Sequence, residues 1–151
     1  MRDDLMADLD VSGITDTIRQ LNKADLFTDE NLKEMLTAGA DIMLQAVKSA
    51  FVEAGHNNIG LERRTGATYR HIVRRASLRR DKHGDPYMVV SVTGKDSRGQ
   101  RYGAKAFALN YGRRTGGKIP ADYYWSRAKQ NAWPKVNGAM VEIAARKLKG
   151  E

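Results

Sequence analysis

The hydrophobic positions of residues 28–55 repeat with the period of an α-helix. Thr28 is a good N-cap, and Asp29 and Glu30 follow it where negative charge is favourable. Gly55 is a natural stop. Between these signals, apolar and small residues recur every three or four positions: Leu32, Met35, Leu36, Gly39, Ile42, Met43, Ala46, Val47, Ala50 and Ala54. The pattern predicts one long helix over residues 28–55, with Ile42 facing the core.

Residues 1–27 show a weaker pattern of the same kind. Ile14, Ile18 and Leu21 fall at i, i+4 and i+7, which marks one apolar face of a helix. The run breaks at residues 25–27. This segment is therefore predicted to be a short helix followed by a connector.

The period changes to two in the middle of the chain. Residues 72–79 alternate as a half-buried strand, and residues 87–93 predict a firmer strand because β-branched residues dominate there. Residues 94–99 read as a hairpin loop. Residues 101–109 are predicted to return as the next strand, although their alanine-rich centre leaves a short helix open. A small antiparallel sheet is expected within residues 67–111.

Helical spacing returns in residues 121–149. Tyr124, Trp125, Ala128 and Ala132 share one side, and apolar positions continue from Val136 to Leu148. Pro134 is predicted to kink the chain or to start a new helix. Helices at both ends and strands between them indicate an α+β fold in one domain, residues 1–151, with the long N-terminal helix and the C-terminal helix packed on the sheet.

Composition removes several classes of function. The chain has no cysteine, which excludes a disulfide framework, a thiolate metal site and a cysteine nucleophile. No run of 18 apolar residues is present, so no membrane segment is expected. Residues 1–10 carry four aspartates and do not resemble a targeting peptide.

Candidate chemistry is equally sparse. Residues 112–119 match the G-x-x-x-x-G-K part of a phosphate-binding loop, but Ile119 replaces the Ser/Thr that would hold Mg²⁺, and Pro120 disfavours an immediate helix. The three histidines, at positions 56, 71 and 83, have no metal-ligand spacing. The sequence therefore predicts no catalytic, cofactor-binding or metal residues, and no enzyme.

Charge is strongly segregated along the chain. Residues 1–62 hold 5 Lys/Arg and 12 Asp/Glu, whereas residues 63–118 hold 15 and 3, within a total net charge of +8. Such a distribution suits a nucleic acid, or a second copy docked acidic face to basic face in a head-to-tail ring; ordinary solvated faces are the plainer alternative. We expect the inter-subunit contacts to come from two loops, residues 94–103 and 112–120, that order on docking. Their candidate contact residues are Arg98, Arg101, Arg113, Arg114 and Lys118.

Four features in order resemble the phage head–tail joining family of neck and tail-completion proteins. The first is the short helix and long helix. The second is Thr65-Gly66-Ala67-Thr68-Tyr69-Arg70-His71-Ile72. The third is the aromatic run Ala106-Phe107-Ala108-Leu109-Asn110-Tyr111-Gly112. The fourth is Ile119-Pro120-Ala121 followed by Tyr123, Tyr124 and Trp125 at the start of the last helix. Ala67-Thr68 departs from the family's usual x-Leu, and the family's proline near the end of the long helix is missing.

The resemblance implies an α+β structural subunit of the virion without a catalytic site or cofactor. It implies a homo-oligomeric ring at the neck or tail, assembled in the host cytoplasm, that contacts connector, stopper, terminator or tail-tube proteins around the DNA channel. A basic module that binds nucleic acid without sequence specificity is the alternative, since tyrosines are interleaved with the arginine pairs.

Overall fold

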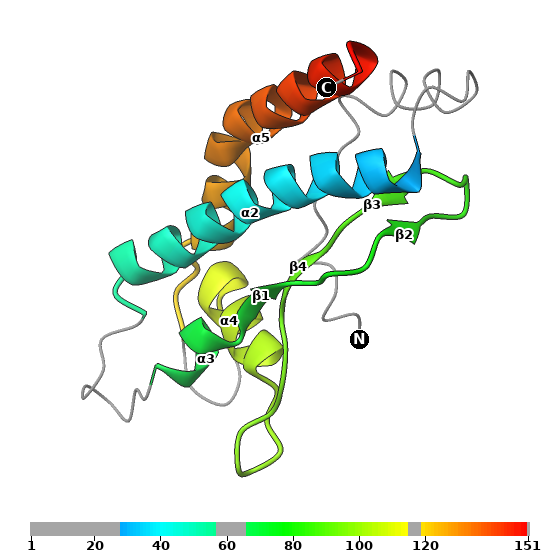
Figure 1. The fold of residues 1–151 in the computed structure, drawn as a ribbon. Coiled ribbons are helices and arrows are strands. Elements are labelled where there is room, and N and C mark those ends of the chain that lie inside the picture. Colours follow the sequence, from blue (N-terminus) through cyan, green and yellow to red (C-terminus); the bar gives the residue numbers. More distant parts are fainter. Residues whose placement is uncertain (1–27, 57–65, 115–118, 151) are drawn as a thin grey trace.

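The computed structural model describes residues 28–56, 66–114 and 119–150. The element order within them is α2 (Asp29–Glu53), α3 (Ala67–Arg70), β1 (Ile72–Arg74), β2 (Arg79–Arg80), β3 (Pro86–Tyr87), β4 (Val90–Val92), α4 (Tyr102–Tyr111) and α5 (Tyr124–Leu148). The predicted α+β class is confirmed, with a long N-terminal helix, a C-terminal helix and a small antiparallel sheet (Figure 1). The short helix predicted within residues 1–27 lies outside the described residues.

Helix α2 begins and ends as its sequence indicates. The hydroxyl of Thr28 accepts a hydrogen bond from the backbone N–H of Asn31 at 3.1 Å, and Gly55 follows the helix with a φ of +79°. The buried face is rotated slightly from the predicted one. Phe51 is 1% exposed, whereas Ile42 is only partly buried at the margin of the core. Ile42 therefore packs against the core, as predicted, but from its margin and not from its centre.

Helix α5 packs antiparallel along α2. Tyr124 at its start contacts Phe51, with ring centroids 5.5 Å apart, and Lys147 near its end pairs with Glu34 at 2.9 Å. Between these points Gly39 lies against Met140. A Cβ at Gly39 would lie 2.9 Å from the sulfur of Met140, so the two helices approach closely only because this residue has no side chain.

Pro134 does not start a new helix, which was one of the two outcomes predicted for it. Helix α5 continues through this residue as one element of 25 residues. Pro134 lacks an N–H donor, but it lies on the exposed side of the helix, where water can hydrate the carbonyl that loses its partner. Residues on the opposite side, including Val136 and Met140, are fully buried against α2, which holds the helix together on both sides of the proline.

The strands form a ribbon beside α2. Strands β1 and β4 pair antiparallel, with Ile72 opposite Val92. Strands β2 and β3 also pair antiparallel, with Arg79 opposite Tyr87. The strands predicted over residues 72–79 and 87–93 are each interrupted, the first between β1 and β2 and the second between β3 and β4. Two ion pairs, Arg74 to Asp41 at 2.6 Å and Arg80 to Asp29 at 2.7 Å, fasten the ribbon to α2. The twelve-residue separation of Asp29 and Asp41 along the helix and the six-residue separation of Arg74 and Arg80 along the extended ribbon both span about 20 Å. The ribbon therefore runs along the axis of α2.

The largest correction concerns residues 101–109. They belong to helix α4 and do not form the predicted third strand. Within the residues that the structure describes, the only strand pairs are β1 with β4 and β2 with β3. Gly103, which has no side chain, and Ala106 are both buried in α4. The high helix propensity of alanine is compatible with this outcome, but it did not decide between helix and strand in the sequence. The segment predicted as sheet, residues 67–111, thus contains two helices as well.

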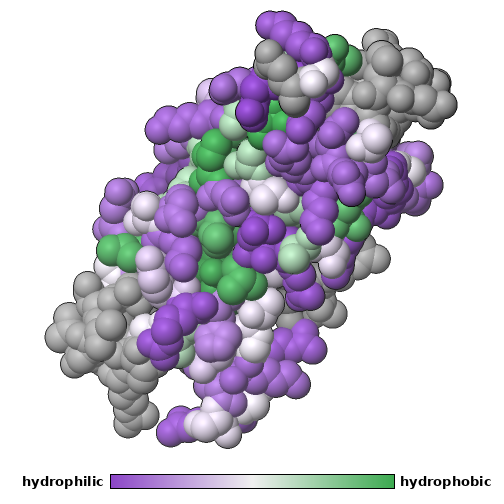
Figure 2. All heavy atoms as spheres, in the orientation of Figure 1, coloured by the Kyte–Doolittle hydropathy of each residue, from purple (hydrophilic) through white to green (hydrophobic). Residues whose placement is uncertain are grey.

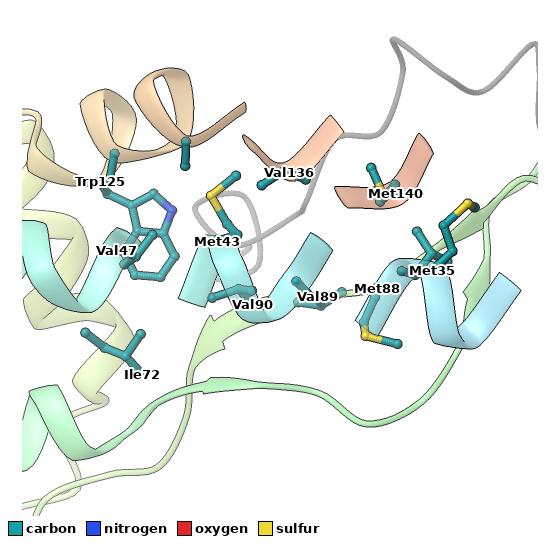
Figure 3. Close-up of a cluster of buried hydrophobic side chains, with 14 of the residues drawn as sticks. Met35, Met43, Val47, Ile72, Met88, Val89, Val90, Trp125, Val136 and Met140 are labelled. Carbon is teal, nitrogen blue, oxygen red and sulfur yellow. The ribbon is translucent and has the colours of Figure 1, made fainter. Parts of the chain in front are cut away.

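The core is rich in methionine and alanine. Met35, Met43, Met88 and Met140 are each 3% exposed or less and fill the space between α2, α5 and the ribbon (Figure 3). The face seen in Figure 2 is mainly hydrophilic, and its hydrophobic residues emerge in small separate groups. On this face, exposed apolar side chains are therefore local features.

Candidate interaction surface

The junction between α4 and α5 is organised by one buried amide. Asn110, in the last turn of α4, is 0% exposed. Its Oδ1 accepts hydrogen bonds from the backbone N–H groups of Trp125 at 2.9 Å and Ser126 at 3.3 Å, and its Nδ2 donates to the hydroxyl of Ser126 at 3.2 Å. Because the N-cap residue Tyr123 offers no side-chain cap, Asn110 satisfies the free donors of the first turn of α5 from another helix.

Asp122 supplies a second cap at the same junction. Its Oδ1 accepts the backbone N–H of Tyr124 at 3.0 Å, and its Oδ2 lies 2.5 Å from Nε2 of His56. The His56 ring also contacts Phe51 and Tyr124, with centroid distances of 5.4 and 5.1 Å. The end of α2 is thereby tied to the start of α5.

Tyr124 completes this buried connection. Its hydroxyl donates to the carbonyl of Ala106 on α4 at 3.2 Å. Burial raises the pKa of this phenol well above its ordinary value, with a smaller contribution from the carboxylate of Asp122. The hydroxyl therefore stays protonated and acts as a donor.

Three aromatic rings meet on the surface beside this rigid junction. The centroids of Phe107 and Tyr111 are 4.6 Å apart, and those of Tyr111 and Tyr123 are 6.3 Å apart in an edge-to-face arrangement. Tyr111 is 46% exposed and Tyr123 51%. We call Phe107, Tyr111 and Tyr123 the aromatic patch. Exposed tyrosines of this kind are typical of protein-binding surfaces.

The backbone at Tyr123 is unusual. With a φ of +56°, it is the one non-glycine residue of positive φ among those the structure describes. A left-handed conformation costs roughly 1–2 kcal/mol for a residue with a Cβ. Its N–H donates to the carbonyl of Asn110 at 3.0 Å, and its carbonyl accepts from Arg127 at 2.9 Å, so the strained residue is held in place.

Two of the predicted contact arginines adjoin the aromatic patch. Arg113 and Arg114 are exposed immediately after Gly112. Arg113 and Ile119 exchange two backbone hydrogen bonds of 2.9 Å, which close the base of this loop. A Cβ on Gly112 would lie 3.0 Å from the backbone of both Ile119 and Ala121, so this tight base requires glycine. The fifth candidate residue, Lys118, lies outside the described residues.

The other two arginines lie at the opposite end of α4. Arg98 and Arg101 are exposed on the loop between β4 and α4. The ten residues of α4 correspond to about 15 Å, so the two arginine pairs form separate surfaces and not one cluster.

The loop that carries Arg98 is not the unanchored segment that was expected. Asp96 accepts hydrogen bonds from the backbone N–H groups of Arg98 and Gln100, both at 2.9 Å, and from Nζ of Lys105 at 2.7 Å. Lys105 above all, followed by the Gln100 N–H, holds the pKa of Asp96 below its ordinary value of 3.8. These hydrogen bonds anchor the loop within the subunit.

Ion pairs within the subunit neutralise part of the acidic charge of the N-terminal region. Three carboxylates on α2, those of Asp29, Glu34 and Asp41, pair with basic side chains of the same subunit. The described part of α2 therefore offers a second copy less unpaired negative charge than the sequence implies.

No group of three or more potential metal ligands occurs within residues 28–56, 66–114 and 119–150. In the same ranges, no helix is both long enough and apolar enough to cross a membrane. Comparison with known proteins finds no matching family model, no similar curated protein and no similar solved structure.

Sequence reasoning missed the residues that build this surface. Asn110 and Tyr111 were named only within the aromatic run of residues 106–112, and Tyr123 only as one of several aromatics. A usable signal was present: residues 119–123 offer a single good capping side chain, that of Asp122, ahead of a long helix. The position of the second cap on another helix depends on the tertiary fold.

Proposed function

We propose that this chain is a structural subunit of a phage neck or tail, in which several copies form a ring that joins head and tail or completes the tail. The proposal rests on the order of the four sequence features that resemble the head–tail joining family. The confirmed α+β fold supports it, since that class is what the resemblance implies.

The observation that carries the proposal is the surface at the α4–α5 junction. Tyr111, Tyr123 and Arg114 are exposed there on a junction fixed by Asn110 and Asp122. Tyrosine and arginine are enriched among the residues that dominate the energy of protein interfaces, and a preorganised surface loses little entropy on binding. The third and fourth features of the resemblance meet at this junction.

Two measurements test the proposal. Mass spectrometry of purified virions and assembly intermediates of a phage that encodes this chain should detect the protein. Electron microscopy should show unjoined heads and tails when Arg113, Arg114 and Lys118 are all changed to Glu, while the purified variant keeps its circular dichroism and melting temperature. Absence of the wild-type protein from virions would refute the structural role, and normal infectious particles would refute docking through this loop.

Binding of nucleic acid is the second candidate function, favoured by charge. The described residues contain twenty lysines and arginines and ten aspartates and glutamates. We expect weak binding of DNA without sequence preference, because phosphate contacts release counterions but read no bases. Fluorescence anisotropy with two unrelated duplexes should show affinity that falls steeply between about 50 and 200 mM salt. A sequence-specific complex stable at physiological salt would make this the better assignment.

A further inference from the structure

The aromatic patch lies at one end of the subunit, and the chain enters the described fold at the other. Tyr123 adjoins Tyr124, which packs on Phe51 in the last turn of α2. Thr28 caps the first turn of the same helix, 23 residues before Phe51, which corresponds to about 35 Å along the helix. The segment before Thr28 therefore joins the body far from the patch of its own copy.

That segment has the complementary chemistry. Residues 1–27 contain six aspartates and three lysines or arginines, against the arginines beside the patch. Its apolar positions Ile14, Ile18 and Leu21 share one helical face. They span seven residues, about 10 Å along a helix, which fits three surface rings with consecutive centroid distances of 4.6 and 6.3 Å.

We propose that the acidic, apolar segment around residues 10–25 of one copy binds the aromatic patch and Arg114 of the next copy. The inference rests on the proposed function, because it supplies the contact between neighbouring ring subunits. Each copy then donates a segment at one end and accepts one at the other. Such a head-to-tail contact closes into a ring when the rotation between copies permits.

The patch fits this partner better than nucleic acid. Binding of a strand needs a groove with a run of cations and aromatic faces spaced along it. Here Tyr111 and Tyr123 meet edge to face within one compact group. An amphipathic segment uses such a group as an apolar anchor, with its acidic side toward Arg114.

The test separates donor from acceptor in the full-length chain. The donor-defective variant carries Ile14→Ser and Ile18→Ser, and the acceptor-defective variant carries Tyr111→Ala and Tyr123→Gly. Glycine suits the positive φ of residue 123, so we expect the acceptor-defective variant to melt close to wild type. In sedimentation velocity, each variant alone should remain monomeric, and an equimolar mixture should give a heterodimer and no larger species. A mixture that stays monomeric, or variants that associate as wild type does, would overturn the proposal.

Binding of a peptide of residues 1–27 tests the same contact independently. Labelled peptide should bind the donor-defective chain saturably at about 150 mM salt, and Tyr123→Gly and Arg114→Glu in that background should each weaken binding about tenfold or more. Arg98→Glu is the matched control, since it makes the same charge change at the other end of α4 and should leave peptide affinity within about twofold.

Three results would contradict the inference: no peptide binding, equal binding to the Tyr123→Gly variant, or a wild-type chain that stays monomeric and refuses the peptide because its own segment occupies the patch. These outcomes concern the purified chain. They are distinguishable from failure of the proposed function, which is decided by whether virions contain the protein.

Discussion

The side-chain carbonyl of Asn110 accepts the backbone N–H of Trp125 at 2.9 Å, and this hydrogen bond joins the end of α4 to the start of α5. The two residues are 15 positions apart, yet Asn110 performs the role that a neighbouring N-cap serves in most helices. Both residues are buried, so water cannot replace the bond. Tyr123 is held at the same junction, because its N–H donates to the backbone carbonyl of Asn110 at 3.0 Å.

Removal of this cap should destabilise the protein. Asn110→Ala leaves the N–H groups of Trp125 and Ser126 without the amide oxygen, and we expect a loss of about 1–3 kcal/mol in the free energy of unfolding. Urea denaturation followed by tryptophan fluorescence measures it. Asn131→Ala, at an exposed position of α5, is the control and should change stability by less than about 0.5 kcal/mol. Equal midpoints for the two variants would show that the cap is dispensable.

Substitution of the glycines in α2 and α5 should change the stability of the protein in opposite directions. Gly39→Val would press its side chain against Met140 and Val136, and we expect a loss of about 1–3 kcal/mol. Gly138→Ala meets no atom within 4 Å on the exposed side of α5, so it should gain up to about 1 kcal/mol from helix propensity. Thermal melting of both variants checks the pair. A stabilising Gly39→Val would mean that the helices are less closely packed than the structure shows.

The observed register of α2 predicts which of two aspartate substitutions lowers stability more. Val47 is 0% exposed, and Val47→Asp should cost on the order of 3 kcal/mol or more because it buries a carboxylate without a partner. Ile42 lies at the margin of the core, so the carboxylate of Ile42→Asp can reach water at a smaller cost. Chemical denaturation of both variants decides the order. If Ile42→Asp were the more damaging change, the register first predicted from the sequence would be right after all.

The loop that carries Arg98 should open in acid. The folded-state pKa of Asp96 lies below its ordinary value of 3.8, so the carboxylate stabilises the loop above that pH. This contribution is lost as the pH falls below 3.8 and through the folded-state value. Amide hydrogen exchange at Gln100, measured by NMR between pH 5 and pH 2.5 and corrected for intrinsic rates, should show protection that declines with acid. Asp96→Asn should abolish this pH dependence, and unchanged protection in the wild type would contradict the assignment.

The extent of prediction from sequence follows the kind of interaction. Helix α2 was foreseen because its cap, stripe and stop are all local. Residues 101–109 were assigned to the wrong element because a short alanine-rich run has no decisive period, and packing of Gly103 and Ala106 settled it. Pro134 was expected to kink the chain or to start a new helix. No new helix starts there, because buried residues on both sides of the proline, including Ala132 and Val136, outweigh one missing hydrogen bond. Arg98, Arg101, Arg113 and Arg114 were correctly predicted to lie on loops, and their role in contacts between subunits stays a prediction.

The sequence by itself determined the α+β class, the position of the long helix and the exposure of the arginine loops, because period, capping residues and charge act over a few neighbouring positions. Only the tertiary structure decided that the acids of α2 are paired within the subunit, and that Asn110 caps another helix. It also decided that Phe107, Tyr111 and Tyr123 meet at one surface. Apart from the pair Phe107–Tyr111 within α4, these relationships join residues 12 to more than 100 positions apart, and the packing of α2, α4, α5 and the strands brings them within contact distance.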